Sequence, residues 1–160
     1  MLIKWLELDF TEYRGKSLPQ IIFDDPYWFL TAVDNDVFKP EVNAWLTYQA
    51  LLLRDKSRII RPRSIGRIKP IVEYHLNLNP EGIRFSYIRI VSQSKNSGVG
   101  NLPFKMDVID WGFPRMLNSS DKAGTESIVK ETKLFFFGGD FEISRGKAEE
   151  FFDDERNFRY

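Results

Sequence analysis

Residues 54 to 69 hold the densest positive charge in the chain, with Asp55 as the single opposing acid. Closely spaced lysines and arginines can neutralise neighbouring phosphates, and the guanidinium fork matches phosphate oxygens with two hydrogen bonds. This pattern predicts a basic segment that binds nucleic acid. Its candidate residues are Arg54, Lys56, Arg58, Arg61, Arg63, Arg67 and Lys69.

Two more cations, Arg14 and Lys16, flank a glycine near the start of the chain and extend this prediction. Tyr27 and Trp28 follow and offer aromatic surfaces on which bases can stack. Charge runs, however, are usually solvated. The basic segment can therefore also be interpreted as a linker, or as a patch that docks the acidic residues near the end of the chain, Glu149, Glu150, Asp153, Asp154 and Glu155.

A second set of residues suggests metal-dependent hydrolysis. Asp107 or Asp110, on an expected strand, precedes Glu131-Thr132-Lys133, which enters another expected strand, and Glu73 on the expected hairpin offers an extra carboxylate. This order resembles the PD-(D/E)XK nucleases, and the resemblance implies that the carboxylates would hold Mg²⁺ while Lys133 stabilises developing negative charge. The alternative function is thus a magnesium-dependent nuclease using Asp110, Glu131 and Lys133.

Composition excludes several other chemistries. The chain has no cysteine and one histidine, His75, so it lacks thiolate metal ligands, cysteine nucleophiles and the material for most zinc sites. The run of three phenylalanines at 135 to 137 suggests a different role, because side chains alternate along a strand and cannot all face one core. A third interpretation is therefore a protein-binding adaptor or inhibitor that uses the acidic residues together with Phe136, Phe151 and Phe152.

The charge balance and the hydropathy of the chain limit the classes of partner that it can be expected to bind. The 160 residues carry 23 basic and 23 acidic side chains, so attraction to a polyanion must come from local clustering. Residues 1 to 10 lack the continuous apolar run of a signal peptide, and no later stretch reaches the ~20 apolar residues of a membrane span. We expect a soluble, cytoplasmic protein without a membrane partner, and its oligomeric state stays open.

The first elements expected are two short helices that meet at a corner. Ser17 and Gln20 have the spacing of a capping box, and Pro19 fits the first helical turn. Asp25 before Pro26 predicts a second capped start. A longer helix is expected from Pro40 to about residue 56.

The period then changes to that of strands. Residues 68 to 91 predict a β-hairpin, whose turn at 79 to 82 has Pro and Gly at favoured positions. Further strands are expected at 105 to 111 and 133 to 137, with a short helix after Thr125 and a final helix at 144 to 152. The fold class is α+β, with a helical module at 1–62 and an antiparallel sheet with a C-terminal helix at 63–160, or one continuous domain.

The corner also resembles a known module, on the residues Tyr13, Arg14, Gly15, Lys16, Leu18, Pro19, Ile21, Ile22, Asp25, Pro26, Tyr27 and Phe29. That module is found as a stand-alone bacterial or phage protein and at the C-terminus of exodeoxyribonuclease X-like, DnaQ-type exonucleases. The resemblance implies an association with DNA processing and no active site. Together with the basic segment, it leads us to expect a small non-enzymatic protein that binds nucleic acid or a nucleic-acid-processing complex, without a cofactor; Mg²⁺ is implied only by the nuclease alternative.

Overall fold

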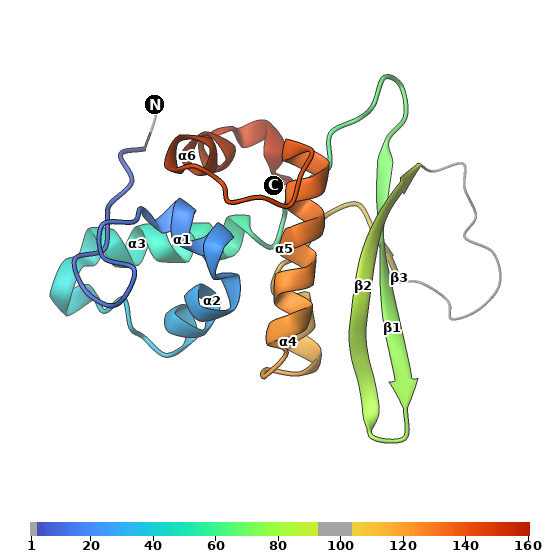
Figure 1. The fold of residues 1–160 in the computed structure, drawn as a ribbon, viewed down its shortest axis with the longest axis horizontal. Helices are drawn as coiled ribbons and strands as arrows, with labels where there is room; N and C mark the ends of the chain where they lie inside the picture. Colours follow the sequence, from blue (N-terminus) through green and yellow to red (C-terminus); the bar gives the residue numbers. More distant parts are fainter. Residues whose placement is uncertain (1–2, 93–103) are drawn as a thin grey trace.

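The computed structural model describes residues 3–92 and 104–160 and has an α+β fold, as the sequence predicts (Figure 1). Its sheet has three antiparallel strands in the order β2-β1-β3. Three helices precede the strands in the sequence and three follow them. The elements are α1 (Leu18–Asp24), α2 (Pro26–Asp34), α3 (Pro40–Lys56), β1 (Pro70–Asn79), β2 (Gly82–Ser92), β3 (Phe104–Met106), α4 (Phe113–Leu117), α5 (Lys122–Phe137), α6 (Arg145–Asp153) and the 3₁₀ turn η1 (Glu155–Asn157).

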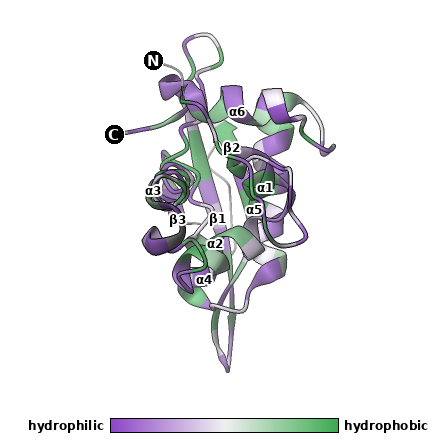
Figure 2. Cartoon of the chain, turned by 90° about the vertical axis from the view of Figure 1, so that its left-hand side faces the viewer, coloured by the Kyte–Doolittle hydropathy of each residue, from purple (hydrophilic) through white to green (hydrophobic). Residues whose placement is uncertain are grey.

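The helix α5 stands between the sheet and the helices α1, α2, α3 and α6, at the centre of Figure 1. It packs on β2 and on α2, while α6 returns to pack on α1. An aromatic core joins these helices: the ring centroids of Trp111, Phe137, Phe151 and Phe152 lie 5.3–5.8 Å from that of Phe23. Helices such as α4 and α6 carry both hydrophobic and hydrophilic segments in Figure 2, as expected of helices that bury one side.

The corner between α1 and α2 forms as predicted, although only one of its two caps does. Asp25 accepts a hydrogen bond from the Trp28 amide at 3.1 Å and caps α2. Ser17, in contrast, makes no side-chain cap, and its buried hydroxyl has no hydrogen-bond partner among the described residues. The reason is that the Ser17 backbone bridges to Glu7, which keeps the side chain inside the core.

The predicted helix from Pro40 is present with a kink, because Asn43 has non-helical angles (φ −161°, ψ 101°). The Asn43 carboxamide accepts from the amides of Trp45 and Leu46 and restarts the helix. Further along, Gln49 is fully buried. Its carboxamide accepts from the Leu6 amide and donates to the Lys4 carbonyl, which fastens the N-terminal segment to α3.

The predicted hairpin is confirmed as β1 and β2, with residues 79 and 82 paired across its turn. The third strand is shorter than the expected 105 to 111 and ends at Met106. The chain leaves the sheet there because the Tyr74 hydroxyl donates to the Val108 carbonyl and accepts from the Asp110 amide. Ile109 then pairs with Ile60 in an isolated bridge.

The expected strand at 133 to 137 is wrong, because these residues end the 16-residue helix α5. Asp121 caps its start by accepting from the Gly124 amide, and Gly138 ends it in the left-handed region at φ 76°. Successive side chains of a helix point about 100° apart, so the three phenylalanines lie on different sides of α5. The expected short helix after Thr125 is therefore part of a longer one.

The final helix agrees with its prediction. Ser144 caps α6 by accepting from the Lys147 amide at 3.3 Å. Phe151 and Phe152 are buried against the aromatic core, with 5 % and 0 % of their surface exposed. No helix within residues 3–92 and 104–160 has the length and apolar character needed to cross a membrane.

Candidate functional site

The predicted basic segment divides into three groups with different surroundings. Lys56 lies inside the protein, Arg54 and Arg58 lie beside α4, and the remaining four cations lie on the segment between residues 61 and 69, which we call the basic loop. In Figure 1 this loop projects at the top of the molecule, in green. These surroundings matter because a phosphate needs cations that are both exposed and free to turn toward it.

Lys56 is a structural cation. Its side chain is 3 % exposed, and its amine donates to the Phe152 carbonyl and to Glu155, each at 2.7 Å. The amine also lies 4.8 Å from the centroid of the Phe158 ring. The partial burial of Glu155 acts to raise the pKa of its carboxyl group, but the hydrogen bond from Lys56 and other contacts outweigh this effect and lower that pKa. Lys56 is thus positioned to hold α6 and η1, and it is not placed to contact a phosphate.

Arg54 and Arg58 line a hollow of about 210 Å³ together with Arg115. Each of the three arginines pairs with a carboxylate: Arg54 with Asp55 at 2.9 Å, Arg58 with Asp110 at 3.4 Å, and Arg115 with Asp34 at 2.7 Å. Every cation of this hollow therefore has its own counterion. The hollow has little excess charge to offer an anionic ligand.

The basic loop surrounds a second hollow, of about 320 Å³, which we call the cationic hollow. Four cations line it: Arg61, Arg63, Lys69 and Arg156. One carboxylate, Asp154, pairs with two of them, with Arg63 at 2.6 Å and with Arg156 at 2.9 Å. Within the described part of the chain, Arg61, Lys69 and the neighbouring Arg67 have no ion pair, so positive charge is in excess here.

The cations of this hollow are held on a defined backbone. The Arg61 amide donates to the Asn157 carbonyl at 2.7 Å, and Ile65 and Ile68 pair across a tight turn at Gly66, whose φ is 63°. The Asn157 side chain is buried; it accepts from the Arg63 guanidinium at 2.7 Å and 3.0 Å and donates to the Phe151 carbonyl. The loop is thus anchored to the C-terminal segment.

Asp154 orients the two arginines that it pairs with. Hydrogen bonding from Arg156 lowers the pKa of Asp154 to about 2, against the weaker opposing effect of burial. The carboxylate is therefore ionised at neutral pH and fixes both guanidinium groups. Two of the predicted contacts between the basic segment and the acidic residues do form, Lys56 with Glu155 and Arg63 with Asp154.

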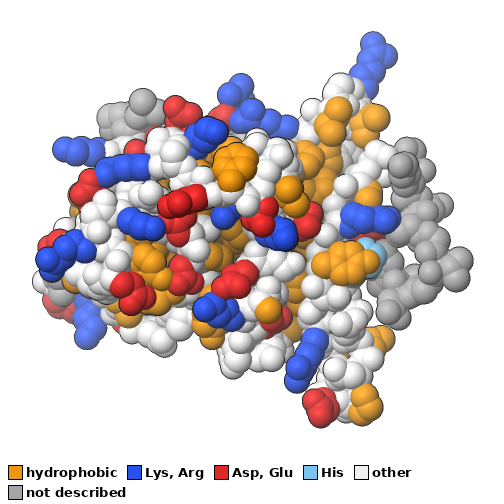
Figure 3. All heavy atoms as spheres, viewed as in Figure 1, with side chains coloured by type: hydrophobic (Ala, Val, Ile, Leu, Met, Phe, Trp, Pro, Cys, Tyr) orange, Lys and Arg blue, Asp and Glu red, His pale blue; other side chains and the backbone are white. Residues whose placement is uncertain are grey.

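Arg14 and Lys16 do not join this surface. They lie on the turn before α1, at the left of Figure 1, whereas the basic loop is at the upper right. Lys16 pairs with Asp24 at 2.7 Å, and Arg14 is exposed. Positive and negative side chains are interspersed over most of the face in Figure 3, and cations project at its upper edge.

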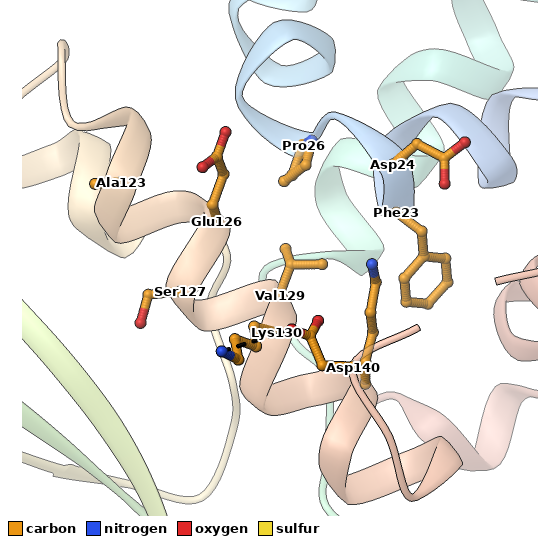
Figure 4. A pocket seen from close by; sticks show the side chains of 10 residues that line it. Phe23, Asp24, Pro26, Ala123, Glu126, Ser127, Val129, Lys130 and Asp140 are labelled. Atoms are coloured by element: carbon orange, nitrogen blue, oxygen red, sulfur yellow. Dashed lines mark ion pairs between the residues drawn. The ribbon is translucent and has the colours of Figure 1, made fainter. Parts of the chain in front are cut away.

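The nuclease arrangement lacks its expected geometry. Glu131 and Lys133 lie on α5 instead of a strand, and Lys133 lines a separate hollow of about 490 Å³ between α5 and the α1–α2 corner (Figure 4). Asp110 is 7 % exposed and lies beside Arg58; burial raises its pKa and Arg58 opposes this. Among the residues that the structure describes, no cluster of three His, Asp or Glu side chains could hold a metal ion.

The predicted partner-binding aromatics are mostly interior. Phe151 and Phe152 belong to the core, while Phe136 is partly exposed, with its ring centroid 5.0 Å from that of Phe151. Phe136 lines a hollow of about 310 Å³ that also includes Arg63. His75 stacks on Tyr87, with ring centroids 4.4 Å apart and an interplanar angle of 7°.

Sequence reasoning missed Arg156, which completes the cationic hollow from η1. The basic segment itself was visible, but Arg156 stands among acidic residues and gave no separate signal. In comparisons with known proteins, no family model, curated protein or solved structure matches the chain.

Proposed function

We propose that this protein binds nucleic acid through phosphate contacts made at the cationic hollow. The observation that carries the proposal is the grouping of Arg61, Arg63, Lys69 and Arg156 around one hollow with a single carboxylate. Neutralising adjacent phosphates is the main source of affinity for nucleic acid, and it requires such an excess of positive charge in one place.

The arrangement of Arg63 and Arg156 supports phosphate binding in particular. Arg63 donates to Asn157 through Nε and Nη2 and to Asp154 through Nη2. Arg156 donates to Asp154 through Nε and Nη2. Their Nη1 groups make no hydrogen bond to any described residue, and each carries two donors. A phosphate oxygen can therefore bind at Nη1 while Asp154 holds each guanidinium in place, which lowers the entropy lost on binding.

This proposal assigns the protein a binding role that needs no catalytic group or cofactor. We further propose, from the resemblance expected between the α1–α2 corner and the module of exodeoxyribonuclease X-like proteins, that the ligand belongs to a DNA-processing system, alone or within a complex. The corner and the cationic hollow are separate surfaces, so one can meet a protein partner while the other holds nucleic acid.

The test is a fluorescence anisotropy titration of labelled single-stranded and duplex DNA and RNA at several salt concentrations. The double variant Arg61→Glu/Lys69→Glu should weaken binding at least tenfold at low salt and reduce the slope of log K against log salt by about 1 to 2, since two phosphate contacts are lost.

The control is Arg84→Glu/Lys122→Glu, which has the same net charge change at exposed positions outside the hollow. It should keep most of the affinity. Equal losses in both variants would mean that total charge governs binding, and the assignment to the cationic hollow would be wrong. Salt-sensitive binding that neither variant reduces would place the site elsewhere.

A further inference from the structure

Another hollow lies next to the cationic hollow. It lies between the end of α5 and α6 and has a volume of about 310 Å³. Three rings line it, those of Phe136, Phe137 and Phe151, together with the polar side chains of Lys147, Glu150, Asp154 and Asn157. Arg63 lines both hollows. We call the hollow between α5 and α6 the aromatic hollow. A cation-lined hollow and an aromatic-lined hollow thus meet at one arginine.

We propose that the aromatic hollow holds one unstacked base of a single-stranded nucleic acid whose phosphates lie in the cationic hollow. This inference rests on the proposed function, since the phosphate contacts bring the strand to the site. Proteins that recognise single strands combine a basic groove with aromatic rings on which bases lie. The two hollows provide these two parts side by side.

The aromatic side chains suit a flat apolar ligand. Phe136 and Phe137 are partly exposed, so each offers surface toward the hollow, whereas Phe151 is 5 % exposed and supports them from the core. Phe136 meets Phe151 edge to face, with an interplanar angle of 82°. A packed wall of this kind keeps its shape without the ligand, so a base binds without ordering the site first.

Arg63 gives the site a second binding surface. Asn157 and Asp154 fix its guanidinium, and a guanidinium plane can stack on a base as well as bond a phosphate. Glu150 also lines the hollow, and its carboxylate has no ion pair within the described residues. It can accept a hydrogen bond from an N–H group on the edge of a base, which a purely apolar partner would leave unused.

The neighbouring charge decides between a base and an apolar protein side chain as the occupant. An apolar protein side chain gains nothing from Arg61, Lys69 and Arg156, whereas a nucleotide carries its own phosphate next to its base. A paired base inside a duplex cannot enter the hollow without leaving its stack. The inferred ligand is therefore single-stranded.

The experiment uses labelled 12-nucleotide single strands with bases, the same strands made fully abasic, and the matching duplex. Phe136→Leu removes the ring and keeps an apolar side chain. Phe135→Leu is the matched control, because Phe135 is the preceding residue of α5 and does not line the hollow. Far-UV circular dichroism and thermal unfolding verify that both variants fold.

We expect Phe136→Leu to weaken binding of the base-containing strand about five- to tenfold, with an unchanged salt slope and unchanged affinity for the abasic strand. Phe135→Leu should bind as the parent does. If Phe136→Leu does not fold, the parent protein still decides, because it should bind the base-containing strand at least fivefold more tightly than the abasic one.

Two results would overturn the inference and leave the proposed function intact. The first is equal, salt-sensitive binding of the base-containing and abasic strands, weakened in both cases by Arg61→Glu/Lys69→Glu. The second is tighter binding of the duplex than of the single strand. Equal losses from Phe135→Leu and Phe136→Leu would show that α5 acts through stability alone, and would also overturn it. Binding of none of the three ligands would refute both proposals.

Discussion

Replacing Lys56 by methionine separates the structural cation from the binding ones. Its side chain is 3 % exposed, and its amine donates to the buried Phe152 carbonyl while pairing with Glu155. A hydrogen bond to a charged group contributes about 1.5–3 kcal/mol, and a buried carbonyl left without a donor costs a similar amount. Glu155 is 62 % exposed and becomes hydrated, and methionine recovers apolar contact near Phe158, so the two losses do not add.

The net destabilisation of Lys56→Met is therefore about 2–3 kcal/mol, which lowers the melting temperature of a chain of this size by about 5–10 °C. Urea unfolding followed by circular dichroism measures the free energy. The matched control is Arg54→Met, two residues earlier, where an arginine paired only with Asp55 should contribute less than about 1 kcal/mol.

The same variant is expected to lose stability without losing affinity for nucleic acid. Lys56→Met should bind as the parent does at a temperature where both are folded, because the amine faces the interior. A variant as stable as the parent would refute the argument from burial. Full stability combined with weakened binding would show that Lys56 contacts phosphate and that its contacts inside the protein are dispensable.

Two other predictions concern the caps and the charge network. Asp25→Ala should cost about 1–2 kcal/mol, because it removes both the α2 cap and the hydrogen bond from the Tyr13 hydroxyl. Ser17→Ala should be neutral or stabilising because that hydroxyl is buried without a partner among the described residues, and urea unfolding measures both variants. The pKa of Asp154 falls from 3.8 to about 2 on folding, so its ionised form stabilises the protein above pH 3.8. Asp154→Asn should destabilise at pH 6, and the difference from the parent should disappear as pH falls from 3.8 to 2; a constant difference would show that Asp154 does not act through its charge.

Elements with local signals were predictable from the sequence. The hairpin has turn residues at 79 to 82 and a period of two on either side, and Asp25-Pro26 marks the start of α2. The end of α5 was misread because a run of phenylalanines has high β propensity, which tertiary packing readily overrides. The caps that define that helix, Asp121 and Gly138, are 17 positions apart, so a short window does not contain both.

The site was predictable in its charge and not in its geometry. The sequence contains the basic run, but the depth of each cation depends on α6 and η1, which return to it from almost a hundred positions away. That return buries Lys56, pairs Arg63 with Asp154 and adds Arg156 to the hollow. The spacing of residues along one segment cannot show such contacts.

The pairing of the basic loop with the C-terminal segment has a consequence for biosynthesis. Ile60 bridges to Phe158, the Arg61 amide donates to the Asn157 carbonyl, and the Arg159 amide donates to the Ile59 carbonyl. While the chain emerges from the ribosome, the segment at 59 to 61 has none of these partners until residues 157 to 159 have been made. The nascent protein therefore carries the cations long before it has the hollow, and its binding surface is completed only once residues 157 to 159 have been made.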